Sequence, residues 1–208
     1  MTVVIEALNK KFKTASPQTI INYVLSMASN PIVTTNFGPY SASLLHALSQ
    51  EYKEIPVLWA DSGYNMSATY RFAQQLEQQL DLNLFVYAPR RTRAFLDHHF
   101  GDYMASEEGH QQFTEIVKIE PLQRAFAQQQ PDVWFTNIRK SQTPFRATLD
   151  IFSLSPSGLL KVSPFFNYSD QELEAYLKQH NLPNEIVYFD PTKVVKNKEC
   201  GLHLTAIV

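Results

Sequence analysis

The sequence contains one cysteine, Cys200, among its 208 residues. A single thiol cannot close a disulfide within the chain, and it cannot supply the four thiolates that hold an iron–sulfur cluster. No run of about 18 apolar residues occurs, so we expect no membrane-spanning helix. The first residues also lack the pattern of a signal peptide. These features predict a cytoplasmic protein without internal disulfides.

The chain also has little net charge. Its formal charge is −2 at pH 7, with 44% hydrophobic and 18% charged residues. This composition is typical of a folded domain and gives no general attraction to nucleic acid or to an anionic membrane. Any site for an anion must therefore come from a local cluster of residues.

Short apolar runs alternate with helical patterns from residue 16 to about residue 137. We expect strands at 32–35, 55–60, 84–87 and 133–136, and a hairpin of two short strands within 151–162. Such alternation predicts an α/β fold, with a parallel sheet of about five strands and helices on both faces. Ligands bind such sheets beyond the carboxyl ends of the strands.

The segment at residues 32–46 is the strongest local candidate for a site. A β-branched strand runs into the turn at Gly38-Pro39, and a helix opens near Ser41. Unpaired N–H groups and the helix dipole favour an anion at that position. Taken alone, the segment is more typical of an ordinary β-α turn than of an anion site, because it contains neither a GxGxxG pattern nor a P-loop ending.

Several motifs, in order, resemble those of phosphoadenosine phosphosulfate (PAPS) reductases. The resemblance covers roughly residues 30–203, and Glu199-Cys-Gly-Leu-His203 is similar to the family's catalytic cysteine signature. The other matching segments are Thr35-Asn-Phe-Gly-Pro-Tyr-Ser-Ala-Ser-Leu-Leu-His46, Ala60-Asp-Ser-Gly-Tyr64 with Thr69-Tyr-Arg-Phe72, Lys118-Ile-Glu-Pro-Leu-Gln-Arg-Ala125, and Arg139-Lys-Ser-Gln142 with Arg146.

The resemblance implies an adenine nucleotide α-hydrolase-like fold and the reduction of PAPS to sulfite and adenosine 3′,5′-bisphosphate. Cys200 would form an S-sulfonate intermediate, with His203 beside it. Thioredoxin or glutaredoxin would then release sulfite, since no second cysteine is present. A homodimer without a bound cofactor or metal is also implied. The residues expected to bind substrate are Thr35, Asn36, Phe37, Gly38, Ser41, Asp61, Ser62, Gly63, Arg139, Lys140, Gln142, Arg146, Lys196 and Lys198.

Some candidates also have plain structural interpretations. A lone cysteine such as Cys200 is often an inert buried thiol, although nearby lysines favour the reactive thiolate. His203 can orient the tail or be purely structural. Asp61-Ser-Gly63 can simply cap the next helix, and the arginines at 90, 91 and 93 can form a solvated face. The histidines at 98, 99 and 110 lack the spacing of metal ligands.

We expect residues 1–183 to form the nucleotide-binding domain and residues 184–208 a mobile tail that carries Cys200. The chain departs from the family pattern at Asn36, Pro39, Lys140 and a shortened loop before Cys200. The preference between PAPS and adenylyl sulfate therefore stays open. Other readings are an adenylyltransferase or RNA-modifying enzyme, a divergent member acting on a related adenylylated substrate, or a nucleotide-binding module without catalysis.

Overall fold

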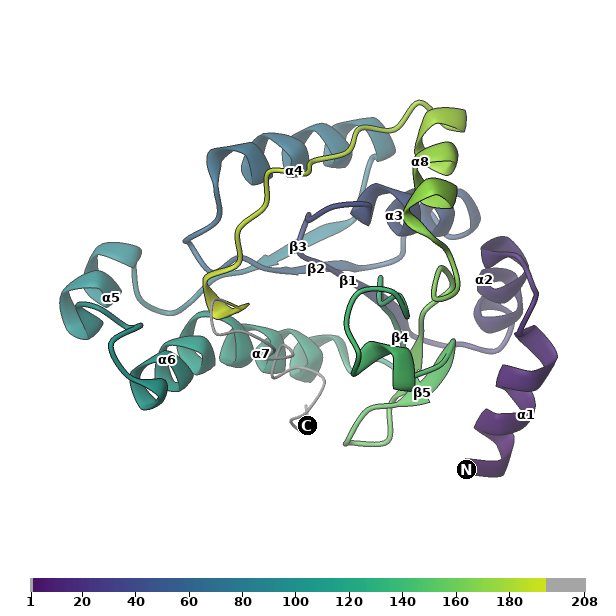
Figure 1. Ribbon diagram of the computed structural model, residues 1–208, viewed down its shortest axis with the longest axis horizontal. Coiled ribbons are helices and arrows are strands. Elements are labelled where there is room, and N and C mark those ends of the chain that lie inside the picture. The colour runs from purple at the N-terminus through teal and green to yellow at the C-terminus, as the bar shows by residue number, and fades with distance from the viewer. Residues whose placement is uncertain (1, 194–208) are drawn as a thin grey trace.

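The computed structural model describes residues 2–193, and the protein forms one sheet between two layers of helices (Figure 1). The strand order is β3-β2-β1-β4-β6-β5. All pairings are parallel except that of β5 with β6. The strands are β1 Pro31–Thr35, β2 Val57–Ala60, β3 Leu84–Tyr87, β4 Val133–Phe135, β5 Phe152–Leu154 and β6 Leu160–Val162.

The expected parallel sheet of about five strands is confirmed, and the antiparallel β5 of the predicted hairpin extends it to six. The α-helices of the described chain are α1 Thr2–Phe12, α2 Pro17–Leu25, α3 Ser41–Glu51, α4 Ser67–Leu80, α5 Arg93–Phe100, α6 Glu107–Thr114, α7 Glu120–Gln129 and α8 Asp170–Gln179. Shorter turns are the π-helical η1 Glu115–Ile119 and the 3-10 turns η2 Arg146–Thr148 and η3 Pro191–Lys193.

The helix caps follow the sequence signals. Ser16 accepts a hydrogen bond from the N–H of Thr19 and caps α2, and Ser169 with Glu172 forms the capping box of α8. The first described residues form α1. Its Asn9 side chain exchanges two hydrogen bonds of 2.8 Å with the backbone of Phe152, so it closes the β5 edge of the sheet.

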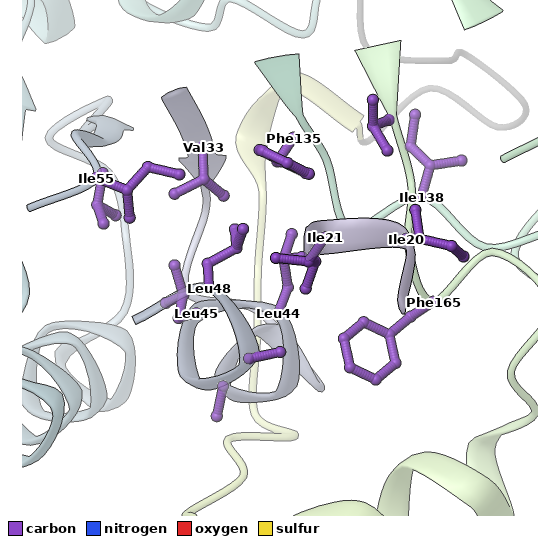
Figure 2. Close-up of a cluster of buried hydrophobic side chains, with 14 of the residues drawn as sticks. Ile20, Ile21, Val33, Leu44, Leu45, Leu48, Ile55, Phe135, Ile138 and Phe165 are labelled. Carbon is purple, nitrogen blue, oxygen red and sulfur yellow. The ribbon is translucent and has the colours of Figure 1, made fainter. Parts of the chain in front are cut away.

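The core has two layers because successive strand residues point to opposite faces of the sheet. Helices α2, α3, α4 and α8 pack on one face, and α7 packs on the other (Figure 1). Figure 2 shows the first layer, where α2 and α3 side chains such as Ile21 and Leu45 meet Val33 and Phe135 of the strands. Both faces are covered, which explains the almost continuous apolar runs of the inner strands.

The stretch from 93 to 119 forms two short helices, α5 and α6, followed by η1. Its buried residues Leu96, Phe113 and Val117 make a separate small cluster that includes no residue of the sheet. This local packing explains the weak periodicity. No helix among residues 2–193 has the length and apolar character needed to cross a membrane.

Candidate active site

A cavity of about 1000 Å³ opens at the carboxyl ends of the central strands β1, β2 and β4. Its floor includes Thr34, Leu58 and Trp134, side chains that point to the α7 face of the sheet. Its rim carries four cationic side chains from widely separated parts of the chain. They are Lys118, Arg139, Arg146 and Lys193. A chain of small net charge thus gathers positive charge at one place.

The loop between β1 and α3 is held by its own side chains. Thr35 Oγ1 accepts a hydrogen bond of 3.0 Å from the N–H of Phe37, and Asn36 Oδ1 accepts one of 3.1 Å from the N–H of Gly38. A Cβ at Gly38 would lie 3.2 Å from Asn36 Oδ1, so a larger residue would press against this turn. Thr35, Asn36 and Gly38 line the cavity as expected.

Phe37 has a different position from the expected one. Its side chain is fully buried in the core, at 4.9 Å from the Trp59 ring and 6.4 Å from the Phe72 ring, between ring centroids. It is therefore an anchor that fixes the loop on the sheet, and it does not line the cavity. Its φ of 47° shows the sharp turn that this anchoring requires.

The first turn of α3 faces the cavity without a capping side chain. Tyr40 occupies the N-cap with a left-handed φ of 61°, and Ser41 follows it on the cavity wall. The Ser41 hydroxyl is buried and has no hydrogen-bond partner within residues 2–193. A buried hydroxyl without a partner costs free energy, so a ligand oxygen at the positive end of α3 would satisfy it.

Arg139 lies beside this helix terminus and is nearly fully buried. Its guanidinium forms an ion pair with Asp170 at the start of α8 and lies 5.0 Å above the ring of Tyr40. Its Nε has no partner within the part of the chain that is described. Burial raises the pKa of Tyr40, and its hydrogen bond to Glu174 raises it further, so the phenol stays neutral under the arginine.

Gln142 connects the two arginines of the cavity. Its Oε1 accepts hydrogen bonds from the backbone N–H of Arg139, at 3.0 Å, and from a guanidinium nitrogen of Arg146. All three expected residues are therefore brought together at the rim. Lys140 is not: its side chain is exposed and lies outside the cavity lining.

The opposite wall is built around Lys118, which projects from the π-helical turn η1. Such turns are frequent at functional sites. The Lys118 ammonium pairs with the Asp190 carboxylate, and both side chains are almost buried. Lys118 also donates to Thr192 Oγ1 at 3.1 Å. Burial alone would raise the pKa of Asp190, but Lys118 and Thr192 lower it to about 2.

These contacts hold residues 184–193 across the mouth of the cavity. Tyr188 accepts a hydrogen bond of 2.7 Å from Asn36 Nδ2, and the backbone N–H of Tyr40 donates to Asn184 Oδ1 at 2.8 Å. The buried His110 ring lies 3.1 Å from the carbonyl oxygen of Pro191. The described part of the expected tail is thus an anchored strap (residues 184–193), and Lys193 at its end lines the cavity.

Asp61, Ser62 and Gly63 follow β2 but do not line the cavity, whereas Ala60 does. Asp61 Oδ1 accepts from the Gly63 N–H, the Asn65 amide and the Tyr70 hydroxyl. Burial and then this last bond raise the pKa of Tyr70 to about 12. The described contacts of Asp61 thus stabilise the turn before α4.

The arginine run after β3 is engaged elsewhere. Arg90 pairs with Glu120, Arg93 pairs with Asp97, and Arg91 lies over the Phe95 ring. None of the three lines the cavity. Within residues 2–193 no group of three histidine, cysteine or acidic side chains is arranged to hold a metal ion.

Sequence reasoning did not place Tyr40, Asp170, Tyr188, Asp190 or Lys193 at the site. Asp170 stands at the start of α8, outside every motif of the resemblance, and residues 184–193 have no periodic pattern. Lys118 stood in a recognised motif and could have been selected on that ground. Four expected site residues, Lys196, Lys198, Cys200 and His203, lie outside the described residues.

Comparison with known proteins identifies relatives along most of the chain. Residues 30–191 match the family model described as phosphoadenosine phosphosulfate reductase domain. A phosphoadenosine 5′-phosphosulfate reductase of Xylella fastidiosa (strain M12) is 33% identical over 181 residues, which are 86% of this chain and 76% of that protein. A protein of the same name from Photobacterium profundum is 30% identical over 178 residues, 85% of this chain and 70% of the relative.

Solved structures share the fold. PAPS reductase from Candida auris, in a phosphate complex, superimposes with a TM-score of 0.76 at 24% identity, covering 86% of this chain and 87% of that one. The FMN adenylyltransferase of Candida glabrata, in complex with FMN and an ATP analogue, gives a TM-score of 0.57 at 13% identity over 86% of this chain and 59% of the other. At these identities the likeness concerns the adenine nucleotide α-hydrolase-like fold alone.

Proposed function

This chain belongs to the phosphoadenosine phosphosulfate reductase family, and from that premise we propose that it reduces PAPS to sulfite and adenosine 3′,5′-bisphosphate. The observation that carries the proposal is the cationic cavity at the strand ends. The substrate bears a phosphosulfate and a 3′-phosphate. Arg139, Arg146 and a helix N-terminus offer these anions donors that a neutral metabolite would not need.

The two ends of the cavity support different roles. The apolar floor formed by Leu58, Leu122 and Trp134 suits a flat purine ring, since ligand pockets combine apolar surface with a few polar groups. At the rim, Ser41 and the α3 terminus lie next to Arg139, which suits the phosphosulfate. We propose that the nucleotide binds with its base towards the floor and its sulfonate towards the strap.

The chemistry would begin at Cys200. Its thiolate sulfur attacks the sulfonate sulfur, a sulfur–sulfur bond forms, and the bond from sulfur to the phosphate oxygen breaks. Adenosine 3′,5′-bisphosphate leaves with that electron pair, which nearby cations stabilise. The reaction resembles phosphoryl transfer, where positioning and charge neutralisation supply most of the catalysis.

Release of sulfite would require two electrons from a dithiol such as thioredoxin or glutaredoxin. One thiolate of the reductant attacks Cys200 sulfur and expels sulfite, forming a mixed disulfide. The second thiol of the reductant then frees the Cys200 thiolate and leaves an oxidised reductant. The sequence contains no second cysteine that could perform this step.

Residues 1–183 would bind the nucleotide, and residues 184–208 would deliver Cys200 to it. The strap supports these two roles, because Tyr188 and Lys193, which precede Cys200 in the sequence, lie on the cavity wall. Lys196, Lys198 and His203 would then act beside Cys200, the lysines on the sulfonate and the histidine on the tail. A homodimer stays a prediction from the family.

The experiment supplies purified protein with PAPS, thioredoxin, thioredoxin reductase and NADPH, and it measures sulfite. We expect sulfite in proportion to PAPS consumed, and none from Cys200→Ser. Parallel titrations with adenylyl sulfate and ATP rank the nucleotides. Folded protein that binds PAPS tightly and releases no sulfite with any dithiol would identify a binding module. Pyrophosphate release from ATP would instead identify an adenylyltransferase.

A further inference from the structure

The outward side of the strap carries a row of exposed apolar side chains. Ile186 is 75% exposed, Val187 52% and Phe189 43%. We refer to these three residues as the strap patch. Tyr188 and Asp190, which alternate with Val187 and Phe189, contact Asn36 and Lys118 instead. Ile186 lies in a turn closed by the Tyr188 N–H on the Ile186 carbonyl oxygen. The same few residues therefore form a wall of the cavity on one side and an apolar surface on the other.

The strap patch is held in place by local bonds. Glu185 Oε1 accepts a hydrogen bond of 2.6 Å from the Val187 N–H, and the carbonyl oxygen of Ile186 accepts one of 3.1 Å from the Tyr188 N–H. This turn presents Ile186 and Val187 outwards between two anchored points, Asn184 and Tyr188. Exposed apolar side chains on a fixed backbone can serve as anchors in a protein interface without a large ordering cost.

We propose that the strap patch is the docking surface for the dithiol protein that reduces Cys200. The inference rests on the proposed function and identifies where its protein partner binds. Two observations favour this occupant. The chain has no second thiol, so an S-sulfonate on Cys200 must be reached by an external dithiol.

The second observation is the length of chain between the strap and the cysteine. Cys200 follows Lys193 by seven positions, a span of at most about 25 Å when fully extended. A protein seated on the strap patch therefore lies within reach of the Cys200 sulfur. Phe189 is only four positions before Lys193, so the patch directly precedes the cysteine-bearing segment in the sequence.

The chemistry of the interface also fits. A dithiol protein must bring its attacking thiolate to the Cys200 sulfur, and apolar contact close to that sulfur in the sequence would hold the two proteins together. Interfaces of this kind concentrate their binding energy in a few apolar or aromatic anchors. Phe189 and Ile186 supply such anchors, with no charged side chain exposed between them.

The test uses the full-length double variant Ile186→Asp with Val187→Asp, and Met27→Asp as the control. Met27 has a comparable exposure of 56%. It lies just before β1, at the amino-terminal end of the strands, whereas the cavity lies at their carboxyl ends. The unsubstituted chain, the double variant and the control are each assayed for sulfite release with thioredoxin and with dithiothreitol. A third assay follows the S-sulfonate on Cys200 formed from PAPS without reductant.

We expect kcat/KM for thioredoxin to fall at least tenfold in the double variant and to stay unchanged in the control. Turnover with dithiothreitol and formation of the S-sulfonate should be unchanged in both, because the cavity side of the strap is intact. A thioredoxin that lacks its resolving cysteine should trap the double variant at least tenfold more slowly than the unsubstituted chain.

Other outcomes overturn the inference in distinguishable ways. Full thioredoxin-dependent activity in the double variant removes the docking role. An equal loss with dithiothreitol, or a loss of the S-sulfonate, means that the patch supports the cavity or covers a segment of its own chain. A change from dimer to monomer in sedimentation assigns the patch to a second copy. If the unsubstituted chain forms no S-sulfonate, the proposed function itself fails, and the dithiol partner fails with it.

Discussion

Two ion pairs lie at the cavity, through Lys118 and Arg139 of its lining, and they differ in how much of each is buried. Lys118 and Asp190 are both almost removed from solvent, with side-chain exposures of 12% and 7%. Arg139 is equally buried at 6%, but its partner Asp170 is 63% exposed. Charges taken out of water depend strongly on their partner, whereas a solvated partner adds little. The first pair is therefore a structural anchor, and the second leaves its arginine available to a substrate anion.

The difference follows from where the partners lie in the chain. Asp190 reaches Lys118 from the strap and also accepts hydrogen bonds from the Thr192 N–H and hydroxyl. Asp170 lies in the first turn of α8, where a carboxylate is already stabilised by the helix dipole. Loss of Asp190 would leave Lys118 without its carboxylate, while loss of Asp170 would leave Arg139 stacked on Tyr40.

The largest effect is expected from Asp190→Asn. The substitution removes the carboxylate that pairs with the buried Lys118 ammonium, and the free energy of unfolding should fall by about 3–5 kcal/mol. Urea unfolding followed by circular dichroism measures it. The double variant Lys118→Met with Asp190→Asn should recover a large part of the loss, because no buried charge remains. A loss below about 1 kcal/mol in the single variant would contradict the role of an anchor.

The sequence predicted much of the fold but only one side of this comparison. The apolar runs and their alternation with helical patterns predicted the sheet and the helices on its two faces, because both depend on local pattern. The cavity loop and the pair Arg139 and Arg146 followed from motifs. The pair of Lys118 and Asp190 joins residues 72 positions apart in segments without periodicity, so only the folded chain could reveal it.

The next effect concerns Arg139→Lys, which keeps the charge and removes the planar fork over Tyr40. A lysine cannot stack on the ring in the same way or offer two parallel donors to an oxyanion. We expect nucleotide affinity to fall about tenfold, or about 1.4 kcal/mol, with little change in unfolding. Calorimetry with adenosine 3′,5′-bisphosphate measures it, and Lys178→Ala on the exposed face of α8 is the control. Equal affinity in both variants would place the anion elsewhere.

Acid should weaken the ion pair of Lys118 and Asp190. The pKa of Asp190 is lowered to about 2 from an ordinary value of 3.8. A carboxyl with a depressed pKa contributes stability that is fully present above pH 4 and is lost as the pH falls towards 2. The loss should reach about 2 kcal/mol. Comparing unfolding at pH 5 and pH 3 tests this, since Asp190→Asn should show a smaller fall than the unsubstituted chain.

The smallest effect is expected from Asp170→Asn. Its carboxylate is mostly in solvent, and Arg139 keeps its stacking on Tyr40, so the unfolding free energy should fall by less than it does in Asp190→Asn. Asp170→Asn should bind the nucleotide more tightly, because one negative charge leaves the rim. Arg139→Lys should bind it more weakly. A stability loss as large as that of Asp190→Asn would show that the two pairs are equivalent.

The most direct test of the whole account is the chemical state of Cys200 after incubation with PAPS and no reductant. If the cavity positions the phosphosulfate for attack by the thiolate, peptide mass spectrometry should find one SO₃ group on Cys200, together with one equivalent of adenosine 3′,5′-bisphosphate. Addition of thioredoxin should then remove the group and release sulfite. An unmodified Cys200 in a protein that still produces sulfite would contradict the account.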